Sequence, residues 1–269
     1  MGSRVMDRRA LLQIARDAVG EGARLLFSAP PGEVTIKSDR DYVTELSTRI
    51  QSVLEDLLTQ LTPDIAFFGE EGAARPVFPE RGRAWVLDPI DGTSNFIHGL
   101  PLCAVSLALI EDGKPVLGVI DAPFLELEYY ASEGEGAYSN GEPISVSSAS
   151  LPGDAIISIG DYAVGAEAGR KNQDRLAATA ALASKVERVR MFGSPALDLA
   201  WVAEGRTDGC VMLSNKPWDT AAGVIIAREA GAEVTGTDGA PHTIGSAHTV
   251  AATPALSPAL LELLAESLN

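Results

Sequence analysis

The segment that most constrains the fold of this chain is residues 85–96, which read WVLDPIDGTSNF. The apolar residues 84–87 are typical of a buried strand, and the proline after Asp88 restrains that residue to an extended conformation. A glycine then permits a sharp turn, and Thr93 and Ser94 stand where a helix N-cap is expected. The segment therefore predicts a strand that ends in two carboxylates, Asp88 and Asp91, beside the start of a helix.

This arrangement has a chemical meaning. Carboxylate oxygens are preferred ligands of Mg²⁺, and free N–H groups at a helix start attract anions. The segment therefore predicts a site for a hard cation and a phosphate group together.

Two further segments add carboxylates. Residues 67–71 read FFGEE, a short apolar strand that ends in Glu70 and Glu71. Residues 217–223 read PWDTAAG, with Asp219 near the start of an apolar helix. Taken singly, Asp88 could be an ordinary turn residue and Asp219 an ordinary helix cap. The three segments together indicate a shared metal site, whereas a role for Glu71 stays open.

In this order and spacing, the three segments resemble the inositol monophosphatase family of Mg²⁺-dependent, lithium-sensitive phosphatases. The resemblance covers nearly the whole chain. It implies a phosphomonoesterase that hydrolyses a small polyol or sugar phosphate, such as inositol-1-phosphate, through attack by a metal-activated water. Two to three Mg²⁺ ions would bind per site, and they would neutralise the phosphate in a chain with 37 acidic and 21 basic residues.

The resemblance also implies roles for individual residues. One Mg²⁺ would be held by Glu70, Asp88 and the carbonyl of Ile90, a second by Asp88, Asp91 and Asp219, and a weaker third with help from Glu70. Thr93, Glu70 and Asp91 would be the catalytic residues, with the Thr93 hydroxyl orienting the water. Phosphate and substrate would be bound by Gly92, Thr93, Ser94, Gly193, Ser194, Pro195 and Asp219.

The chain departs from the family pattern at position 47. The family has an aspartate four residues after the valine of its V-T-x-x-D block, and that aspartate accepts a hydrogen bond from the threonine. Here the block reads VTELS, so Ser47 stands in its place. A hydroxyl can orient a threonine but cannot act as a base near neutral pH. We expect a reduced turnover that an aspartate at this position would raise.

A second departure concerns the substrate. Seven residues before Asp219, many relatives have a glutamate that contacts inositol hydroxyls, and this chain has Met212. A thioether accepts only weak hydrogen bonds. Either Ser214, Asn215 or another subunit supplies the contact, or myo-inositol phosphate is not the preferred substrate.

Apolar periodicity predicts helices at residues 6–27 and 44–61, with Ser47 in the first turn of the second. Strands are expected at 84–88, 102–110, 115–121 and 127–131, with hairpin turns at Asp112–Gly113 and Asn140–Gly141. After residue 150, strands near 155–159, 186–191, 209–213 and 249–252 alternate with helices near 169–184, 195–203, 219–230 and 257–268.

These patterns predict an α/β protein with an α+β half at 1–150, carrying Glu70 and the DPIDGT loop, and an α/β half at 151–269, carrying Asp219. The first half should contain a largely antiparallel sheet covered by its two helices. The resemblance implies a layered α-β-α-β-α sandwich with the metal site between the halves.

Composition excludes several partners. A net charge of −16 argues against nucleic-acid and anionic-membrane binding, and the longest apolar run is too short to span a bilayer. Cys103 and Cys210 lack metal or redox spacing, which favours reduced core residues and a cytoplasmic protein. The three histidines lack metal-binding spacing and are expected to be structural or surface residues, although His98 could face the substrate entrance. The family resemblance adds an expected homodimer.

Rival functions remain within the same fold. Histidinol phosphate, fructose-1,6-bisphosphate and 3′-phosphoadenosine 5′-phosphate are alternative substrates. The scarcity of basic residues near the motifs argues mildly against substrates with two phosphates, although distant loops could supply an Arg or Lys. Asp161 and Tyr162 could line the pocket, although a solvated loop is the favoured interpretation. A low-activity member that acts mainly as a binding or regulatory protein is the alternative from another class, suggested by Ser47 alone.

Overall fold

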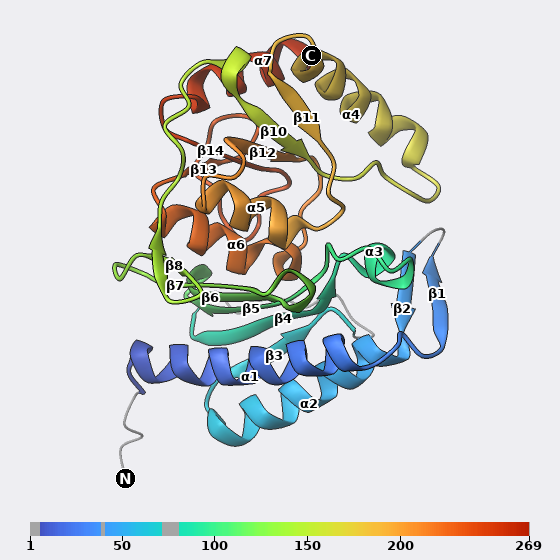
Figure 1. The fold of residues 1–269 in the computed structure, drawn as a ribbon, viewed down its shortest axis with the longest axis vertical. Helices are drawn as coiled ribbons and strands as arrows, with labels where there is room; N and C mark the ends of the chain where they lie inside the picture. Colours follow the sequence, from blue (N-terminus) through green and yellow to red (C-terminus); the bar gives the residue numbers. More distant parts are fainter. Residues whose placement is uncertain (1–5, 39–40, 72–80, 269) are drawn as a thin grey trace.

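The computed structural model describes residues 6–38, 41–71 and 81–268. Figure 1 shows five stacked layers: two helices, a seven-stranded sheet, two helices, a five-stranded sheet and two helices. The predicted α-β-α-β-α sandwich is confirmed. The chain passes from the first sheet to the second between residues 144 and 156, and a division into separate domains stays a prediction.

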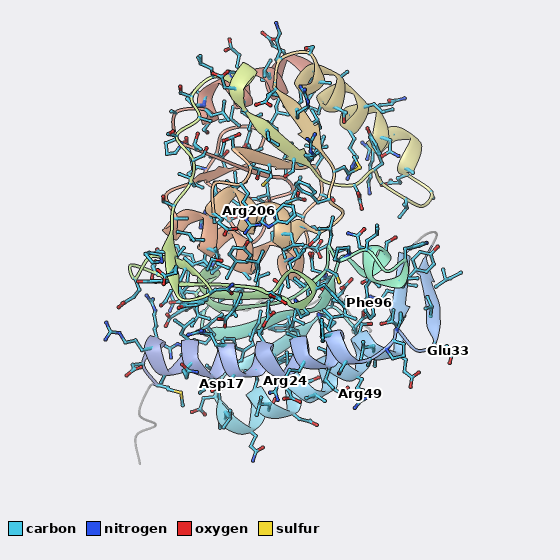
Figure 2. The ribbon with its side chains drawn as sticks, in the orientation of Figure 1. Asp17, Arg24, Glu33, Arg49, Phe96 and Arg206 are labelled. Carbon is cyan, nitrogen blue, oxygen red and sulfur yellow. The ribbon has the colours of Figure 1, made fainter. Side chains whose placement is uncertain are left out.

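The outer layer of the first half is built from α1 (Arg8–Ser28) and α2 (Glu45–Leu61), within one or two residues of the predicted bounds. Both helices bury an apolar stripe against the sheet, whereas Asp17, Arg24 and Arg49 are exposed on their outer sides (Figure 2). A two-stranded antiparallel ribbon, β1 (Val34–Ser38) and β2 (Asp41–Thr44), precedes α2. The sequence did not predict this ribbon.

The seven-stranded sheet has the order β3-β4-β5-β6-β7-β8-β9. It is antiparallel except for the parallel pair β3–β4, and both predicted hairpin turns have the positive φ angles that such turns require. Its strands are β3 (Ala66–Gly69), β4 (Arg83–Asp91), β5 (Ala104–Glu111), β6 (Lys114–Ala122), β7 (Leu127–Ser132), β8 (Ala137–Ser139) and β9 (Glu142–Ile144).

The five-stranded sheet has the order β11-β10-β12-β14-β13 and mixes parallel and antiparallel pairs. Its strands are β10 (Ile156–Ile159), β11 (Arg188–Arg190), β12 (Gly209–Met212), β13 (Glu233–Thr235) and β14 (Thr249–Ala252). The helices of this half are α4 (Ala168–Ala183), α5 (Pro195–Ala203), α6 (Pro217–Glu229) and α7 (Ser257–Ser267). Only β13 is absent from the sequence-based prediction.

Three apolar cores fill the four interfaces between the layers, because the middle core extends on both sides of α5 and α6 and contains residues of both sheets. Residues 220–227 of α6 are all buried, which confirms the expectation from its apolar surface on every side. The helix lies directly on β6, because a Cβ added at Gly118 would stand 2.6 Å from the carbonyl oxygen of Ala222. This close contact fixes the depth of α6 and therefore the position of Asp219 at its start.

Within the described ranges, no helix is long and apolar enough to cross a membrane. Cys103 and Cys210 are buried free thiols, in line with the sequence-based expectation for the two cysteines.

The contact between α6 and β6 predicts that Gly118→Ala lowers the free energy of unfolding by about 1–3 kcal/mol, because the added methyl group overlaps backbone. Urea denaturation measures the change. Gly169→Ala in α4 is the matched control, because a Cβ added at Gly169 would have nothing within 4 Å. Equal stability of the two variants would contradict the tight packing of this layer.

Candidate active site

The strand β4 ends at Asp91, and the chain then turns into the short helix α3 (Thr93–Ile97). Gly92 is the N-cap residue, with φ of 80°, so the expectation of a cap at Thr93 or Ser94 is wrong by one residue. Only glycine fits this position without strain, for two reasons. The positive φ angle disfavours other residues, and an added Cβ would stand 2.6 Å from the carbonyl oxygen of Leu102. The tight turn leaves the N–H groups of Thr93 and Ser94 at the free start of α3.

Asp88 and Asp91 are almost fully buried at the end of β4, 3% and 2% exposed. Burial raises the pKa of Asp88 well above its usual range, and the charges of Glu70, Asp91 and Asp219 raise it further. Burial and the charge of Asp219 likewise raise the pKa of Asp91. The structure therefore brings together the four carboxylates that the sequence predicts as metal ligands.

A cation fits the donor set of these four residues. The carboxylates repel one another without a charge to compensate them, and hard oxygen donors suit Mg²⁺. Within the described residues, however, no group of three or more Asp, Glu, His or Cys side chains is arranged so that it could hold a metal ion by itself. A bound ion would therefore take further oxygen atoms, such as the carbonyl of Ile90, water or the substrate phosphate. The assignment of these residues as ligands stays a prediction.

The second half of the chain positions Asp91. The Ser194 hydroxyl, which is fully buried, donates to Asp91 Oδ2, and the backbone N–H of Ala196 donates to the same atom at 3.3 Å. Ser194 is the N-cap of α5 and Pro195 its first residue, as the sequence predicts. The positive end of α5 therefore faces Asp91.

Asn95 ties the loop to the same helix start. Its side-chain amide donates to the carbonyl of Leu102 at 2.8 Å and to that of Phe192 at 2.7 Å. Gly193 follows Phe192 with φ of 72°. The predicted substrate residues Gly193, Ser194 and Pro195 are therefore held against the turn at residues 92–95 by a hydrogen bond between the two halves.

Asp219 is the third residue of α6, whose N-cap is Lys216, so the interpretation of Asp219 as a possible N-cap is wrong. This position still lies in the first turn, where a carboxylate is favoured by the helix dipole. Lys216 Nζ lies 3.8 Å from Glu70 Oε1.

Glu70 and Glu71 stand at the end of β3, and Gln51 of α2 fixes the backbone there. The side chain of Gln51 accepts from Glu71 N at 2.8 Å and donates to Glu71 O at 2.6 Å. Lys37 of β1 forms ion pairs with Glu71 at 2.5 Å and Glu70 at 3.4 Å. Glu71 therefore has a structural partner, and the unpredicted β1–β2 ribbon supplies it.

Ser47 is fully buried in the first turn of α2, as predicted. It forms a capping box with Thr44: the Ser47 amide donates to the Thr44 hydroxyl at 2.9 Å, and the Ser47 hydroxyl accepts from the Thr44 amide at 3.1 Å. The Thr93 hydroxyl donates instead to the carbonyl of Ile90 at 2.8 Å. Ser47 thus serves the helix cap, and the Thr93 hydroxyl is oriented from within its own loop.

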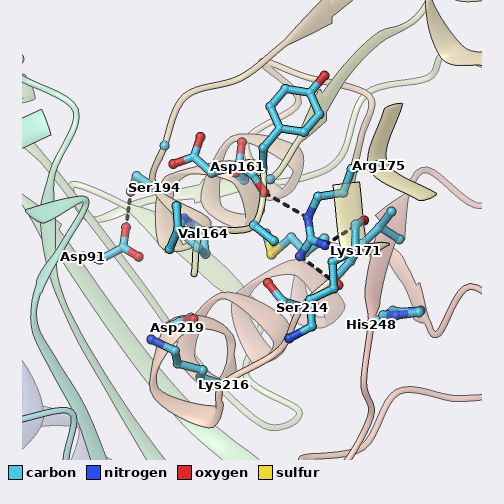
Figure 3. A pocket seen from close by; sticks show the side chains of 18 of the residues that line it. Asp91, Asp161, Val164, Lys171, Arg175, Ser194, Ser214, Lys216, Asp219 and His248 are labelled. Atoms are coloured by element: carbon cyan, nitrogen blue, oxygen red, sulfur yellow. Dashed lines mark hydrogen bonds between the residues drawn. The ribbon is translucent and has the colours of Figure 1, made fainter. Parts of the chain in front are cut away.

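A cavity of about 1080 Å³ opens beside these groups (Figure 3). Asp161 and Tyr162 line it, and Asp161 is at the same time exposed in a loop, so the segment is both a solvated loop and part of the cavity wall. Arg170, Lys171 and Arg175 of α4 also line the cavity, so basic residues reach it from a segment that is distant from the motifs, a possibility that the sequence leaves open. These residues are distant in sequence from the motifs, and their wall forms only when α4 packs on the second sheet.

His98 is a surface residue, in line with the favoured interpretation, whereas His248 lies at the cavity. His98 is exposed at the end of α3, where its Nδ1 lies 2.8 Å from the Ser94 carbonyl oxygen, and it is not among the cavity-lining residues. His248 does line the cavity and contacts the Thr237 hydroxyl at 2.8 Å.

Asp198 is a buried carboxyl that the sequence did not single out. It lies in the first turn of α5 at 1% exposure, and burial raises its pKa to about 7, with a further increase from Asp161 and a decrease from the Ser158 hydroxyl. Both of its carboxyl oxygens are sealed from solvent. An acidic residue in an otherwise apolar helix was the only signal for it.

Comparisons with known proteins agree with this geometry. Residues 7–269 match the model of the inositol monophosphatase family. A Thermotoga maritima protein named fructose-1,6-bisphosphatase/inositol-1-monophosphatase is 40% identical over 73% of this chain and 72% of its own length. Inositol-1-monophosphatase of Mesorhizobium japonicum is 34% identical over 98% of this chain and 99% of its own length.

Solved structures show the same fold. A Thermotoga maritima IMPase superposes with a TM-score of 0.87 at 32% identity, covering 96% of this chain and 98% of its own. The extragenic suppressor protein suhB of Bartonella henselae gives 0.87 at 31% identity, with 95% and 98% covered.

The burial of Asp198 predicts a pH-dependent stability. Its folded pKa of about 7 lies above the ordinary aspartate value of 3.8, so the folded state favours the protonated form. That contribution to stability is complete below about pH 4 and is lost as the pH rises through about 7. Asp198→Asn should therefore gain roughly 2–3 kcal/mol in unfolding free energy over wild type between pH 5 and pH 8.

Urea denaturation of both proteins at pH 5, 6.5 and 8 measures this difference. The exposed Asp56→Asn variant on α2 controls for the loss of one negative charge. A difference between Asp198→Asn and wild type that stays constant with pH would mean that the carboxyl is ionised in the folded protein.

Proposed function

The chain belongs to the inositol monophosphatase family, and we propose that it is a Mg²⁺-dependent phosphomonoesterase that acts on a small polyol or sugar phosphate. The observation that carries the proposal is the convergence of Glu70, Asp88, Asp91 and Asp219 beside the start of α3. Relatives named inositol-1-monophosphatase, matched over nearly their whole length, support the same reaction class.

Different residues of the site would bind the metal ions, bind the phosphate and orient the attacking water. Glu70, Asp88, Asp91, Asp219 and the Ile90 carbonyl would hold the ions, which supply charge neutralisation and water activation when bound. The N–H groups of Gly92, Thr93 and Ser94 would bind the phosphate oxygens, as helix starts do. The Thr93 hydroxyl donates to Ile90 O, so its lone pairs can accept a hydrogen bond from the attacking water.

The N-terminal end of α5 would hold the rest of the substrate. The Ser194 hydroxyl donates a hydrogen bond to Asp91, so the position of the Asp91 carboxylate depends on the position of α5. Gly193 and Pro195 also line the cavity. Substrate bound there would therefore contact both halves of the chain, and proximity would assist the in-line attack.

A bisphosphate substrate is a second candidate. Arg170 and Lys171 reach the cavity from α4, although both also lie near Glu167, at 3.9 and 3.2 Å. A second phosphate could compete for these cations. The Thermotoga maritima relative that is named partly as a fructose-1,6-bisphosphatase supports the same possibility.

Lithium inhibition, a homodimeric state and a cytoplasmic location are further proposals, which rest on the family resemblance and on the reduced thiols. Light scattering during size-exclusion chromatography measures the oligomeric state directly.

Phosphate release from a panel of esters tests the proposed function. We expect turnover that requires Mg²⁺, that Li⁺ suppresses, and that Asp91→Asn lowers by at least about a hundredfold, because an amide is a poorer ligand than a carboxylate. Inositol-1-phosphate and fructose-1,6-bisphosphate on the same panel rank the two candidate substrates. Mg²⁺ binding by calorimetry, without turnover of any ester, would favour a binding or regulatory protein instead.

The buried Ser47 generates a separate prediction. Ser47→Asp should raise kcat by about tenfold if a carboxylate near the loop assists deprotonation of the water. Aspartate is also accepted in the first turn of a helix, so the cap of α2 should survive. Ser47→Ala is the control, since it removes the hydroxyl without adding a carboxylate. A kcat for Ser47→Asp at or below that of wild type would refute this role.

A further inference from the structure

Met212 leaves part of the cavity wall without a strong hydrogen-bond acceptor. It is the last residue of β12, 3% exposed, and lies at the edge of the cavity. A thioether accepts only weakly, so a hydroxyl-bearing substrate must find its acceptor elsewhere. This reasoning rests on the proposed phosphatase function.

Asn215 and Ser214, the two residues of this chain that the sequence suggests as replacement acceptors, are poorly suited to that role. The side-chain amide of Asn215 is engaged with the Ser246 carbonyl at 2.7 Å and with His242 at 3.1 Å, and its oxygen accepts from Thr220 at 2.6 Å. Asn215 is therefore committed to the fold. Ser214 does line the cavity, but it offers a neutral hydroxyl.

The neighbouring strand brings Asp161 to the same place. β10 pairs with β12 in parallel, and the amide of Gly160 donates to the carbonyl of Val211 at 2.9 Å. Gly160 then packs against Met212, because a Cβ added at Gly160 would stand 3.7 Å from Met212 Cγ. Asp161 is the next residue, so it leaves the sheet beside Met212.

The carboxylate of Asp161 faces the side of the cavity that holds the predicted substrate residues. A Cβ added at Gly193 would stand 3.4 Å from Asp161 Oδ2, which places this oxygen next to the start of α5. Figure 3 shows Asp161 and Ser194 on one side of the cavity and Lys216 and His248 on the other.

Arg175 fixes the backbone at this point. Its guanidinium, on a residue 4% exposed, donates to the carbonyl of Asp161 at 3.1 Å and to the carbonyl of Leu213 at 3.1 Å. These two bonds join the ends of β10 and β12. Asp161 is therefore held in place although its side chain is exposed to the cavity.

We propose that Asp161 is a specificity-determining residue whose carboxylate accepts hydrogen bonds from hydroxyl groups of the substrate's alcohol part, in the region where Met212 offers no acceptor. Hydrogen bonds to a charged acceptor are stronger than those between neutral groups. The same charge would repel a second phosphate on this side of the cavity, so the residue favours polyol monophosphates over bisphosphates bound here.

Kinetics on two esters test this role. Asp161→Ala should lower kcat/KM for inositol-1-phosphate by about 10- to 100-fold, mainly through KM. It should leave 4-nitrophenyl phosphate, whose leaving group has no such hydroxyls, within about twofold of wild type. Asp161→Asn keeps one acceptor oxygen without the charge, so its kcat/KM for inositol-1-phosphate should fall less than that of Asp161→Ala. Asp174→Asn, on the exposed face of α4 at the same cavity, is the matched control.

The outcomes separate this inference from the proposed function. Equal losses on both esters would show that Asp161 only supports the structure, and an unchanged KM for inositol-1-phosphate would show that it does not contact the substrate. Either result overturns the proposed role of Asp161 but remains consistent with the proposed phosphatase activity. Absence of turnover by the wild-type protein on both esters would instead overturn the proposed function.

Discussion

The mutual repulsion of four carboxylates is the constraint on which the rest of this structure depends. Asp88 and Asp91 are nearly excluded from solvent, and the charges of Glu70 and Asp219 add to the cost of ionising them. Such a cluster persists only when the surrounding fold fixes it or a cation compensates it. Here the fold fixes it from four directions: the end of β3, the end of β4, the start of α5 and the start of α6.

Both sheets are needed for that arrangement. The first sheet supplies three of the four carboxylates and leads into the turn at Gly92, whereas α5 and α6 belong to the second half and supply Ser194 and Asp219. The close contact between Gly118 and Ala222 sets how far α6 can approach β6. A small change in this packing would move Asp219 relative to Asp91. The site is therefore a product of the layer spacing as much as of its own residues.

The sequence could predict most of the fold because the long elements carry strong periodic patterns. α2 has a continuous apolar stripe, and the hairpin turns carry Asp-Gly and Asn-Gly. The short strands β1, β2 and β13 were missed because three to five residues show too little periodicity. The cap at Gly92 was missed because a helix of five residues gives no pattern of its own. Lys37 and Gln51 were missed for a different reason, since their contacts join elements that are distant in sequence.

Met212 illustrates what a position-by-position comparison leaves out. Compared with the family pattern alone, Met212 indicates only that a hydrogen-bond acceptor expected at this position is missing. In the sheet, however, residues of β10 and β12 lie side by side although about fifty positions separate them in the chain. The carboxylate of Asp161, which follows β10, can therefore offer a hydrogen-bond acceptor beside Met212 at the end of β12. Under the proposed role of Asp161, the substrate preference of this chain would depend on the paired ends of β10 and β12. The parallel register brings these ends to one edge, and Arg175 donates hydrogen bonds to both.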